Sequence, residues 1–252
     1  MKNKTSWEIF IEQQKSLSNE FHKKTSMHKI SQIKNWPKSW TQIHFKRYPR
    51  FKNISLVKPN MFVGSLWESI IQRKSQRDFN NYKISEIEIS NLLYFGSGIT
   101  TSKIIDWDKT TRTYPSAGGR YPLEVYAAIF NSEKINKGLY HYNTQNHSLE
   151  ILINKPVKKD ILAAMHQNWV GKSSIVFIVT SIINRSRIKY ADRAYRYSLI
   201  EAGHIAQNIS LIATALGLGS CAIGGFIDSK LNTLLDIDDE QEFAVYTLAI
   251  GK

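Results

Sequence analysis

The sequence predicts a single domain of mixed α-helices and β-strands that follows a basic N-terminal extension. Residues 174–182 and 242–251 are apolar and rich in β-branched side chains without polar alternation, which is typical of strands buried on both faces. Residues 192–216 form the longest helical pattern. Their apolar side chains spread over more than one face, as in a helix that lies within a core or an interface. No internal repeat divides the chain further.

The extension is expected to span residues 1–62, and the folded domain residues 63–252. Residues 1–24 mix apolar side chains with many charges and predict a helix. Residues 30–62 hold prolines and aromatic anchors, which suit a segment that wraps over another surface.

Two helices are predicted at the start of the domain. Ser65 precedes the first, whose apolar residues repeat with helical spacing at Trp67, Ile70 and Ile71. Ser85 precedes the second, where Glu88 stands at the capping-box position and Gly96 is expected to stop the helix.

The remaining elements follow from local patterns. Residues 123–130 predict a strand, and residues 138–152 predict a hairpin that turns at residues 143–146. Residues 158–169 predict a short helix. His204 falls inside the long helix and is interpreted as a hydrogen-bonded core histidine. Cys221, the single cysteine, is interpreted as a buried filler.

Composition bounds the function. The 252 residues are 42% hydrophobic, which is enough to bury a core and too apolar for disorder. Glu8 and Glu12 interrupt the N-terminus, and no apolar run approaches the ~20 residues of a membrane span, so a cytoplasmic protein is expected. One cysteine excludes an internal disulfide and a cysteine zinc cluster, and no metal site is expected.

The net charge of +13 is concentrated at the N-terminus. The first 60 residues hold 13 Lys and Arg against three Glu, which accounts for +10. Composition leaves two interpretations open: a solvated lysine-rich arm, or a surface for an acidic partner such as nucleic acid or an acidic peptide.

Three further segments suggest a ligand. Residues 73–77 gather three cations and a hydroxyl at a helix end, a set that matches a phosphate monoester. Residues 113–125, "TYPSAGGRYPLEV", combine adjacent glycines with flanking prolines, so backbone N–H groups can approach a flat or anionic ligand. Residues 217–226, "GLGSCAIGGF", form a second glycine-rich loop. Together they describe a ligand with a phosphate and a broad polar ring, which FMN fits.

With these segments the chain resembles the SagB-type dehydrogenases of the FMN-dependent nitroreductase superfamily. The resemblance is carried by "RKSQRDF", "YPSAGGRYPLEVY", "GLYHYN", "KYADRAYRYSLIEAGHIAQNISLIATALGLGSCAIGGF" and "LAIGK", and it spans nearly all of the chain after about residue 20. It implies an α+β fold with a central mixed or antiparallel sheet flanked by helices, in an intertwined homodimer with FMN at the interface.

The resemblance also implies roles for single residues. The FMN phosphate is expected at Arg73, Ser75 and Arg77, with Lys74 and the terminal Lys252 as further basic contacts. The flavin ring is expected against Pro115, Ser116, Ala117 and Gly118, and near the backbone of Ile223, Gly224 and Gly225. Lys189 and Tyr190 match the catalytic pair of azole-forming relatives.

This resemblance implies oxidation of thiazoline or oxazoline rings to thiazoles or oxazoles in a ribosomally made peptide. A hydride would pass to the flavin and a proton to a base, for which Lys189 is the candidate. Arg187 and Arg193 are expected to disfavour its ammonium form. The partners implied are the modified precursor peptide and a cyclodehydratase complex, not nucleic acid.

An alternative keeps the flavin and reverses the electron flow. The protein would then use NAD(P)H to reduce dehydroalanine residues, nitroaromatics or quinones. The absence of a nicotinamide motif does not decide between the two directions.

Overall fold

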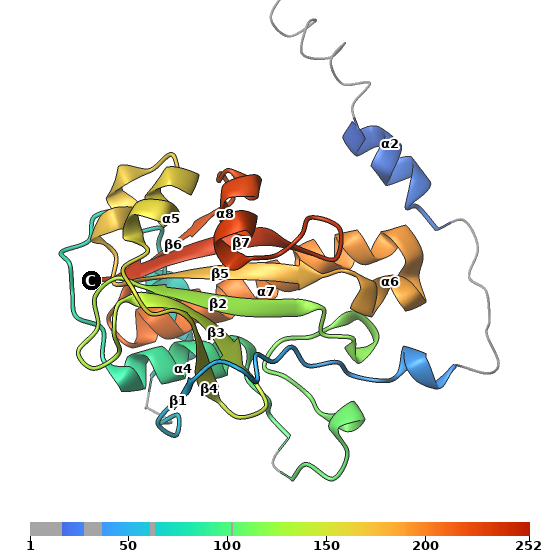
Figure 1. Ribbon diagram of the computed structural model, residues 1–252, viewed down its shortest axis with the longest axis horizontal. Helices are drawn as coiled ribbons and strands as arrows, with labels where there is room; N and C mark the ends of the chain where they lie inside the picture. The colour runs from blue at the N-terminus through green and yellow to red at the C-terminus, as the bar shows by residue number, and fades with distance from the viewer. Residues whose placement is uncertain (1–16, 28–36, 61–63, 102) are drawn as a thin grey trace, which may run out of the picture.

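A computed structural model describes residues 17–27, 37–60, 64–101 and 103–252 of the chain (Figure 1). Its centre is a seven-stranded sheet in the order β1-β4-β3-β2-β5-β7-β6, in which every neighbouring pair is antiparallel. The strands are β1 Asn53–Ser55, β2 Leu123–Ile129, β3 Gly138–Asn143, β4 Ser148–Ile153, β5 Ile175–Ile182, β6 Gly219–Ile223 and β7 Glu242–Gly251. The predicted α+β fold is confirmed.

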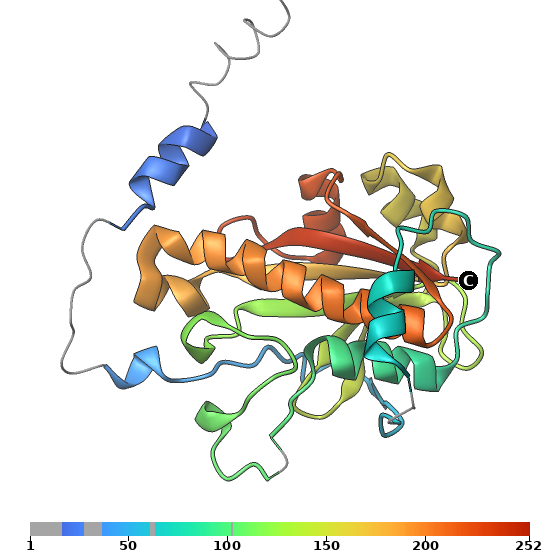
Figure 2. The same cartoon turned by 180° about the vertical axis from the view of Figure 1, so that it is seen from behind.

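Helices cover both faces of this sheet. Figure 2 shows the long helix α7 crossing one face, with α3 and α4 beside its C-terminal half. The helices are α2 Leu17–Lys24, α3 Leu66–Gln72, α4 Glu86–Ser97, α5 Lys158–Ala164, α6 Asn184–Tyr190, α7 Ala194–Ala215 and α8 Asp228–Leu235. Five 3-10 turns complete the described elements: η1 Lys38–Trp40, η2 Trp107–Lys109, η3 Ala117–Gly119, η4 Asn168–Lys172 and η5 Ala191–Arg193.

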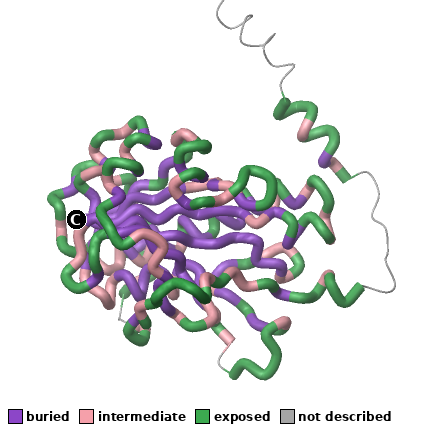
Figure 3. Tube along the Cα trace, in the orientation of Figure 1, coloured by how far each residue is buried: buried purple, intermediate pink, exposed green. Residues whose placement is uncertain are grey.

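Alternation along the central strands builds two cores. Along β5, Phe177 and Val179 face the core formed with α4 and α7, whereas Val176 and Ile178 face the core formed with α5 and α8. Successive side chains of a strand point to opposite faces, so a strand covered on both sides must be apolar at every position. Figure 3 shows this central sheet as the buried part of the molecule. The two strands predicted to be buried, β5 and β7, are therefore confirmed.

The predicted helix starts are confirmed, but one helix stop is wrong. Ser65 caps α3, and Ser85 caps α4 in a complete capping box with Glu88. The helix α4 runs through Gly96 to Ser97 and is capped by Gly98. A Cβ on Gly96 would lie 2.5 Å from the Ile209 side chain, so this glycine permits the close packing of α4 on α7.

Two other predictions, for residues 219–223 and for His204, differ from the structure. Residues 219–223, expected within a glycine loop, form the edge strand β6 because they pair with β7. His204 is exposed on α7 instead of buried. The buried histidine is His141, which is 0% exposed in β3. Cys221 is 3% exposed, as predicted.

Segments before the domain lie on its surface. Helix α2 is the described part of the helix predicted over residues 1–24, and the rest of that prediction lies outside the described residues. Residues 37–60 run along the molecule and add β1 to the sheet beside β4. The division between residues 62 and 63 stays a prediction.

Candidate functional site

One group of predicted ligand residues covers the free edge of β6. The chain leaves α3 at Arg73, and Ser75 then forms a parallel bridge with Ser220 of β6. The backbone N–H of Gln76 donates to the Ser220 carbonyl at 2.9 Å. Gly219 has no side chain, so the Gln76 side chain can occupy the space that a Cβ at position 219 would fill. This contact joins two segments that are far apart in the sequence.

The charges of this corner face solvent. Arg73 is half-buried, and Lys74, Ser75 and Arg77 are exposed. In the described ranges, none of the three cations forms an ion pair with a carboxylate. Lys252 directly follows β7: its carbonyl accepts from the Asn80 N–H at 2.8 Å, and its ammonium lies 5.3 Å from the centre of the Tyr82 ring. The corner is therefore available to an anion.

The far end of β6 exposes backbone. Ile223 is 5% exposed, and its carbonyl accepts from the Thr247 hydroxyl at 3.0 Å. Gly224 and Gly225 follow it and are exposed. A Cβ on Gly225 would meet no atom within 4 Å, so this backbone stands open to a flat group.

A second group forms around the loop from Pro115 to Gly119. Gly118 has φ 61° and Gly119 has φ 65°, values in the left-handed region that favours glycine. A Cβ on Gly118 would lie 2.9 Å from the Lys189 Nζ and would overlap the Tyr190 hydroxyl. The loop backbone thus touches both predicted catalytic side chains.

Lys189 lies in the last turn of α6 and is half-buried. Burial lowers its pKa, and the Arg120 guanidinium lowers it further. Arg187 and Arg193, the two cations predicted to have this effect, are not the ones that lower the pKa of Lys189. Arg187 faces Asp192 at 3.8 Å, and Arg193 donates to other elements.

Arg120 is a buried, fixed cation, 1% exposed. Its guanidinium donates to the carbonyl oxygens of Arg185 at 3.1 Å and Trp40 at 2.6 Å, and also to that of Gln42. It thereby joins the glycine loop, helix α6 and the N-terminal segment. The sequence offered one signal, since this arginine follows the two glycines of "AGGRYP", but its partners are distant in the chain.

Tyr190 is positioned by its neighbour on α7. The Tyr190 and Tyr197 rings meet edge to face with their centres 5.0 Å apart. Burial is the largest cause that raises the pKa of Tyr190 above its usual value. The hydroxyl therefore keeps its proton at neutral pH and can donate a hydrogen bond.

Glu201 is a site residue that was not predicted from the sequence. It lies in α7, is 3% exposed, and its Oε1 accepts from the Ala117 N–H at 2.9 Å. Its Oε2 has no hydrogen-bond partner among the described residues. Burial raises the pKa of Glu201 to about 7. The sequence signal that could have identified Glu201 is a carboxylate within the apolar pattern of a long helix.

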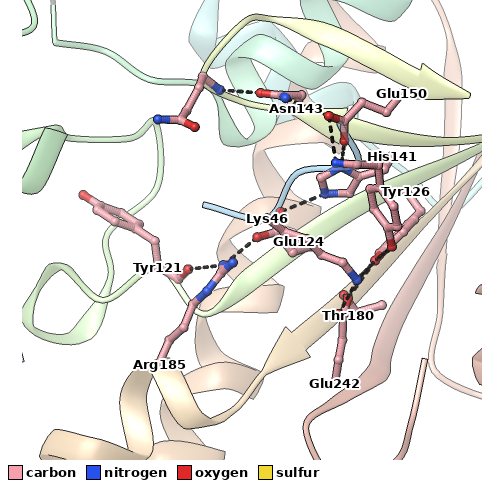
Figure 4. Close-up of polar contacts among 12 residues, drawn as sticks. Lys46, Tyr121, Glu124, Tyr126, His141, Asn143, Glu150, Thr180, Arg185 and Glu242 are labelled. Atoms are coloured by element: carbon pink, nitrogen blue, oxygen red, sulfur yellow. Dashed lines mark hydrogen bonds and ion pairs between the residues drawn. The ribbon is translucent and has the colours of Figure 1, made fainter. Parts of the chain in front are cut away.

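A buried ionic network holds α6 to the sheet (Figure 4). Arg185 of α6 meets Glu124 of β2 at 2.5 Å, and His141 lies between Glu124 at 3.0 Å and Glu150 at 2.7 Å. Burial alone would raise the pKa of Glu124, but Arg185 and His141 outweigh it and hold that pKa at about 2. This anchor lies one helical turn before Lys189 and fixes the helix that presents it.

The two groups do not meet within one chain in the described residues. Glu201 is near the start of α7, whereas α3 packs beside Ala215 at the end of α7. The 14 residues between them span roughly 21 Å of helix. Figure 1 agrees, since α6 and the C-terminus lie at opposite ends of the sheet. The structure thus joins the corner to β6, and the glycine loop to the lysine–tyrosine pair.

Two classes of site are not found. No cluster of three or more His, Cys, Asp or Glu residues suited to a metal ion occurs in the part of the chain that the structure describes. Within the same ranges, none of the helices combines the length and the apolar character that a membrane span requires.

Residues 70–252 match the Nitroreductase family. A protein from Methanocaldococcus jannaschii named "Putative nitroreductase MJ1384" is 31% identical over 195 residues, which cover 77% of this chain and 94% of that protein. The Microcin B17-processing protein McbC of Escherichia coli is 30% identical over 133 residues, which cover 50% of this chain and 49% of McbC. The Trifolitoxin-processing protein TfxB of Rhizobium leguminosarum is 26% identical over 56% of this chain and 39% of TfxB.

Solved structures share the fold. A chain from Anabaena variabilis described as a "putative nitroreductase" superposes with a TM-score of 0.76 at 25% identity, covering 92% of this chain and 46% of that one. A chain of the E. coli microcin synthetase McbBCD complex with truncated pro-MccB17 bound covers 94% of this chain and 91% of its own, with a TM-score of 0.61 at 20% identity. Because the family match spans most of the chain, this protein belongs to the nitroreductase family of oxidoreductases.

Proposed function

We propose that this protein is an FMN-dependent dehydrogenase of the SagB type, which oxidises thiazoline or oxazoline rings in a ribosomally made peptide to thiazoles or oxazoles. One observation carries the proposal: the glycine loop lies against Lys189 and Tyr190, while a fixed arginine lowers the pKa of that lysine. A lysine that gives up its proton more readily is a better base near neutral pH. The similarity to McbC and TfxB supports the same function.

The residues present fit FMN as the cofactor. Arg73, Lys74 and Arg77 have no carboxylate partner in the described residues and stand close to Ser75 in the sequence, a set that suits a phosphate. Gly225 leaves open space for a flat ring. In this proposal Arg73, Ser75 and Arg77 hold the phosphate, with Lys74 and Lys252 beside them. Pro115, Ser116, Ala117 and Gly118 line one side of the ring, and Ile223, Gly224 and Gly225 line the other. When bound, FMN supplies the acceptor for the hydride.

A homodimer completes the site in this account. The two groups of ligand residues lie at separate ends of one chain, so a second copy has to bring its glycine loop to the corner of the first. Exposed apolar side chains provide a surface for that contact. They lie on α3 and near the start of α7: Leu66, Trp67, Ile70, Ile71, Leu199 and Ile200, each between 43% and 82% exposed.

Each side chain of the site has its own role in the proposed reaction. Lys189 takes the proton from one ring carbon of the azoline as the hydride leaves the neighbouring carbon. The Tyr190 hydroxyl, which keeps its proton, donates a hydrogen bond to the reacting ring. Arg120 keeps a positive charge close to Lys189, and Arg185 anchors the helix that carries it. Aromatisation of the ring supplies much of the driving force.

Anaerobic mixing of the FMN-loaded protein with a thiazoline peptide tests this function. The flavin absorbance near 450 nm is expected to bleach within seconds, and the peptide to lose two mass units. The variant Lys189→Ala is expected to retain FMN but to bleach more than about a hundredfold more slowly. A wild-type protein that binds FMN and leaves the peptide unchanged refutes the proposal.

A reductase is the second candidate, favoured by the 31% identity to the M. jannaschii protein over 77% of the chain. It would use NAD(P)H to reduce dehydroalanine residues, nitroaromatics or quinones. Bleaching by NADPH, followed by reoxidation with a nitroaromatic compound, supports this direction. Bleaching by the azoline peptide supports the first one.

The proposed partners are the modified precursor peptide and a cyclodehydratase complex. The McbBCD complex with its bound pro-peptide is a structural neighbour, which supports this association. In this proposal the basic extension docks an acidic leader peptide or a partner subunit. Its basic residues lie on different elements. Lys23 and Lys24 belong to α2, whereas the Arg47 Nε donates to Gln145 in the turn between β3 and β4.

A further inference from the structure

A cavity of about 360 Å³ opens beside the lysine–tyrosine pair, between residues 24–27 of the N-terminal segment and residues 189–193. Its volume falls within the range of small-ligand sites. The wall opposite Lys189 and Tyr190 is therefore built by a part of the chain outside the region of the family match, which begins at residue 70.

Specific contacts hold the N-terminal segment that forms this wall against helix α7. The Arg193 Nη1 donates to the Thr25 carbonyl at 2.7 Å, and the Arg196 Nη2 donates to the His22 carbonyl at 2.6 Å. The Phe21 ring meets the Tyr195 ring edge to face at 5.5 Å and also lies 5.6 Å from the Arg196 guanidinium. Thr25 is 5% exposed. Residues 21–27, the docked segment, are thus held by two arginines and an aromatic pair.

The lining of this cavity is cationic. Lys24 and Arg193 contribute two positive charges to the lining, against one negative charge on Asp192. Lys24 also pairs with Glu20 at 2.7 Å, and Asp192 faces Arg187 at 3.8 Å, so the surroundings add one charge of each sign and the side keeps its positive excess. A second cavity of about 530 Å³ shares Ala191 and Asp192 but lies toward residues 239–243, where Asp239 and Glu240 add negative charge. The two cavities on either side of the turn after Tyr190 therefore carry opposite net charge. An anionic chain is favoured on the side of the docked segment and disfavoured on the other.

We propose that the cavity between the docked segment and residues 189–193 binds the peptide beside its azoline, and that it selects a carboxylate side chain next to the ring. The inference rests on the proposed function for the identity of the ligand as a peptide. It adds a substrate preference and assigns the N-terminal segment a role in specificity.

Binding of fluorescein-labelled decapeptides to the FMN-loaded protein tests the inference without requiring turnover. Two peptides carry one thiazoline each and differ only in Asp or Asn beside the ring. Wild-type protein is expected to bind the Asp peptide about tenfold more tightly, the size of one charge-assisted hydrogen bond. The double variant Phe21→Ala, Arg196→Gln removes the aromatic pair and the Arg196 hydrogen bond, and leaves the Arg193–Thr25 hydrogen bond in place. It is expected to bind both peptides alike.

Lys58→Gln is the matched control, because Lys58 is an exposed basic residue of the extension outside the docked segment. It is expected to keep the Asp preference. Retained FMN and an unchanged circular dichroism spectrum show that the double variant is folded. Equal binding of both peptides by the wild-type protein, no binding at all, or an Asp preference kept by the double variant each overturns the inference. If the proposed function is wrong, the protein binds the peptides but does not oxidise them, and this result is distinct from a loss of the Asp preference.

Discussion

Replacing Glu201 by glutamine separates the charge of this side chain from its hydrogen bond. In the variant Glu201→Gln, the amide oxygen of the new side chain can still accept from the Ala117 N–H, as the Glu201 Oε1 does at 2.9 Å, so the glycine loop keeps its anchor. The change removes only the ability to ionise. Because the carboxyl is 3% exposed and its Oε2 has no partner in the described residues, ionisation in the folded chain is costly.

The pKa gives the size of that cost. Burial raises the pKa of Glu201 from 4.5 to about 7. This rise in the pKa corresponds to about 3 kcal/mol of folding free energy. Since the folded pKa is the higher one, the folded chain keeps a proton that the unfolded chain releases between pH 4.5 and about 7. The contribution to stability is therefore complete below pH 4.5 and is lost as pH rises through about 7.

Urea unfolding of wild type and Glu201→Gln at pH 5, 6, 7 and 8 measures this effect, with circular dichroism as the signal. Other titrating groups contribute to both proteins and cancel in the difference. Relative to wild type, the variant is expected to gain about 2.5 kcal/mol between pH 5 and pH 8. A difference that stays constant within about 0.5 kcal/mol over this range would refute the reasoning, because Glu201 would then be ionised throughout.

Three other predictions follow from the same geometry. Arg185→Ala leaves Glu124 buried without its cation and is expected to cost about 3–5 kcal/mol in urea unfolding, whereas an unchanged stability contradicts the ionic anchor. Arg120→Gln is expected to raise the pKa of Lys189, so the acid limb of the kcat/KM profile moves to higher pH while Arg120→Lys moves it less; an identical limb in both contradicts the role of Arg120. Gly118→Ala forces a Cβ onto Tyr190 at a positive φ, and turnover is expected to fall at least tenfold while Gly119→Ala, with open space at its Cβ, loses less; equal losses contradict the contact.

Elements with strong local patterns were predictable. The strands β5 and β7 and the helix α7 followed from apolar runs, and the capping box of α4 followed from the spacing of Ser85 and Glu88. The strand β6 was missed because its glycines favour a loop locally, and only pairing with β7 makes it a strand. Gly96 was misread as a helix stop because its role is set by packing against Ile209.

The candidate site divides in the same way. Lys189 and Gly118 were named from motifs, and the structure brings them together. Arg120 and Glu201 were not assigned, because each acts through partners more than 60 residues away in the chain. His141 was overlooked in favour of His204, since burial by neighbouring strands and helices is not visible in a local pattern.

The binding of FMN to flavin-free protein tests the central claim most directly. Titration followed by the quenching of flavin fluorescence is expected to saturate at one FMN per chain and to leave a yellow protein after desalting. Arg77→Gln is expected to weaken binding about tenfold, through the loss of a phosphate contact. A titration without saturation, with a colourless protein after desalting, would contradict the account.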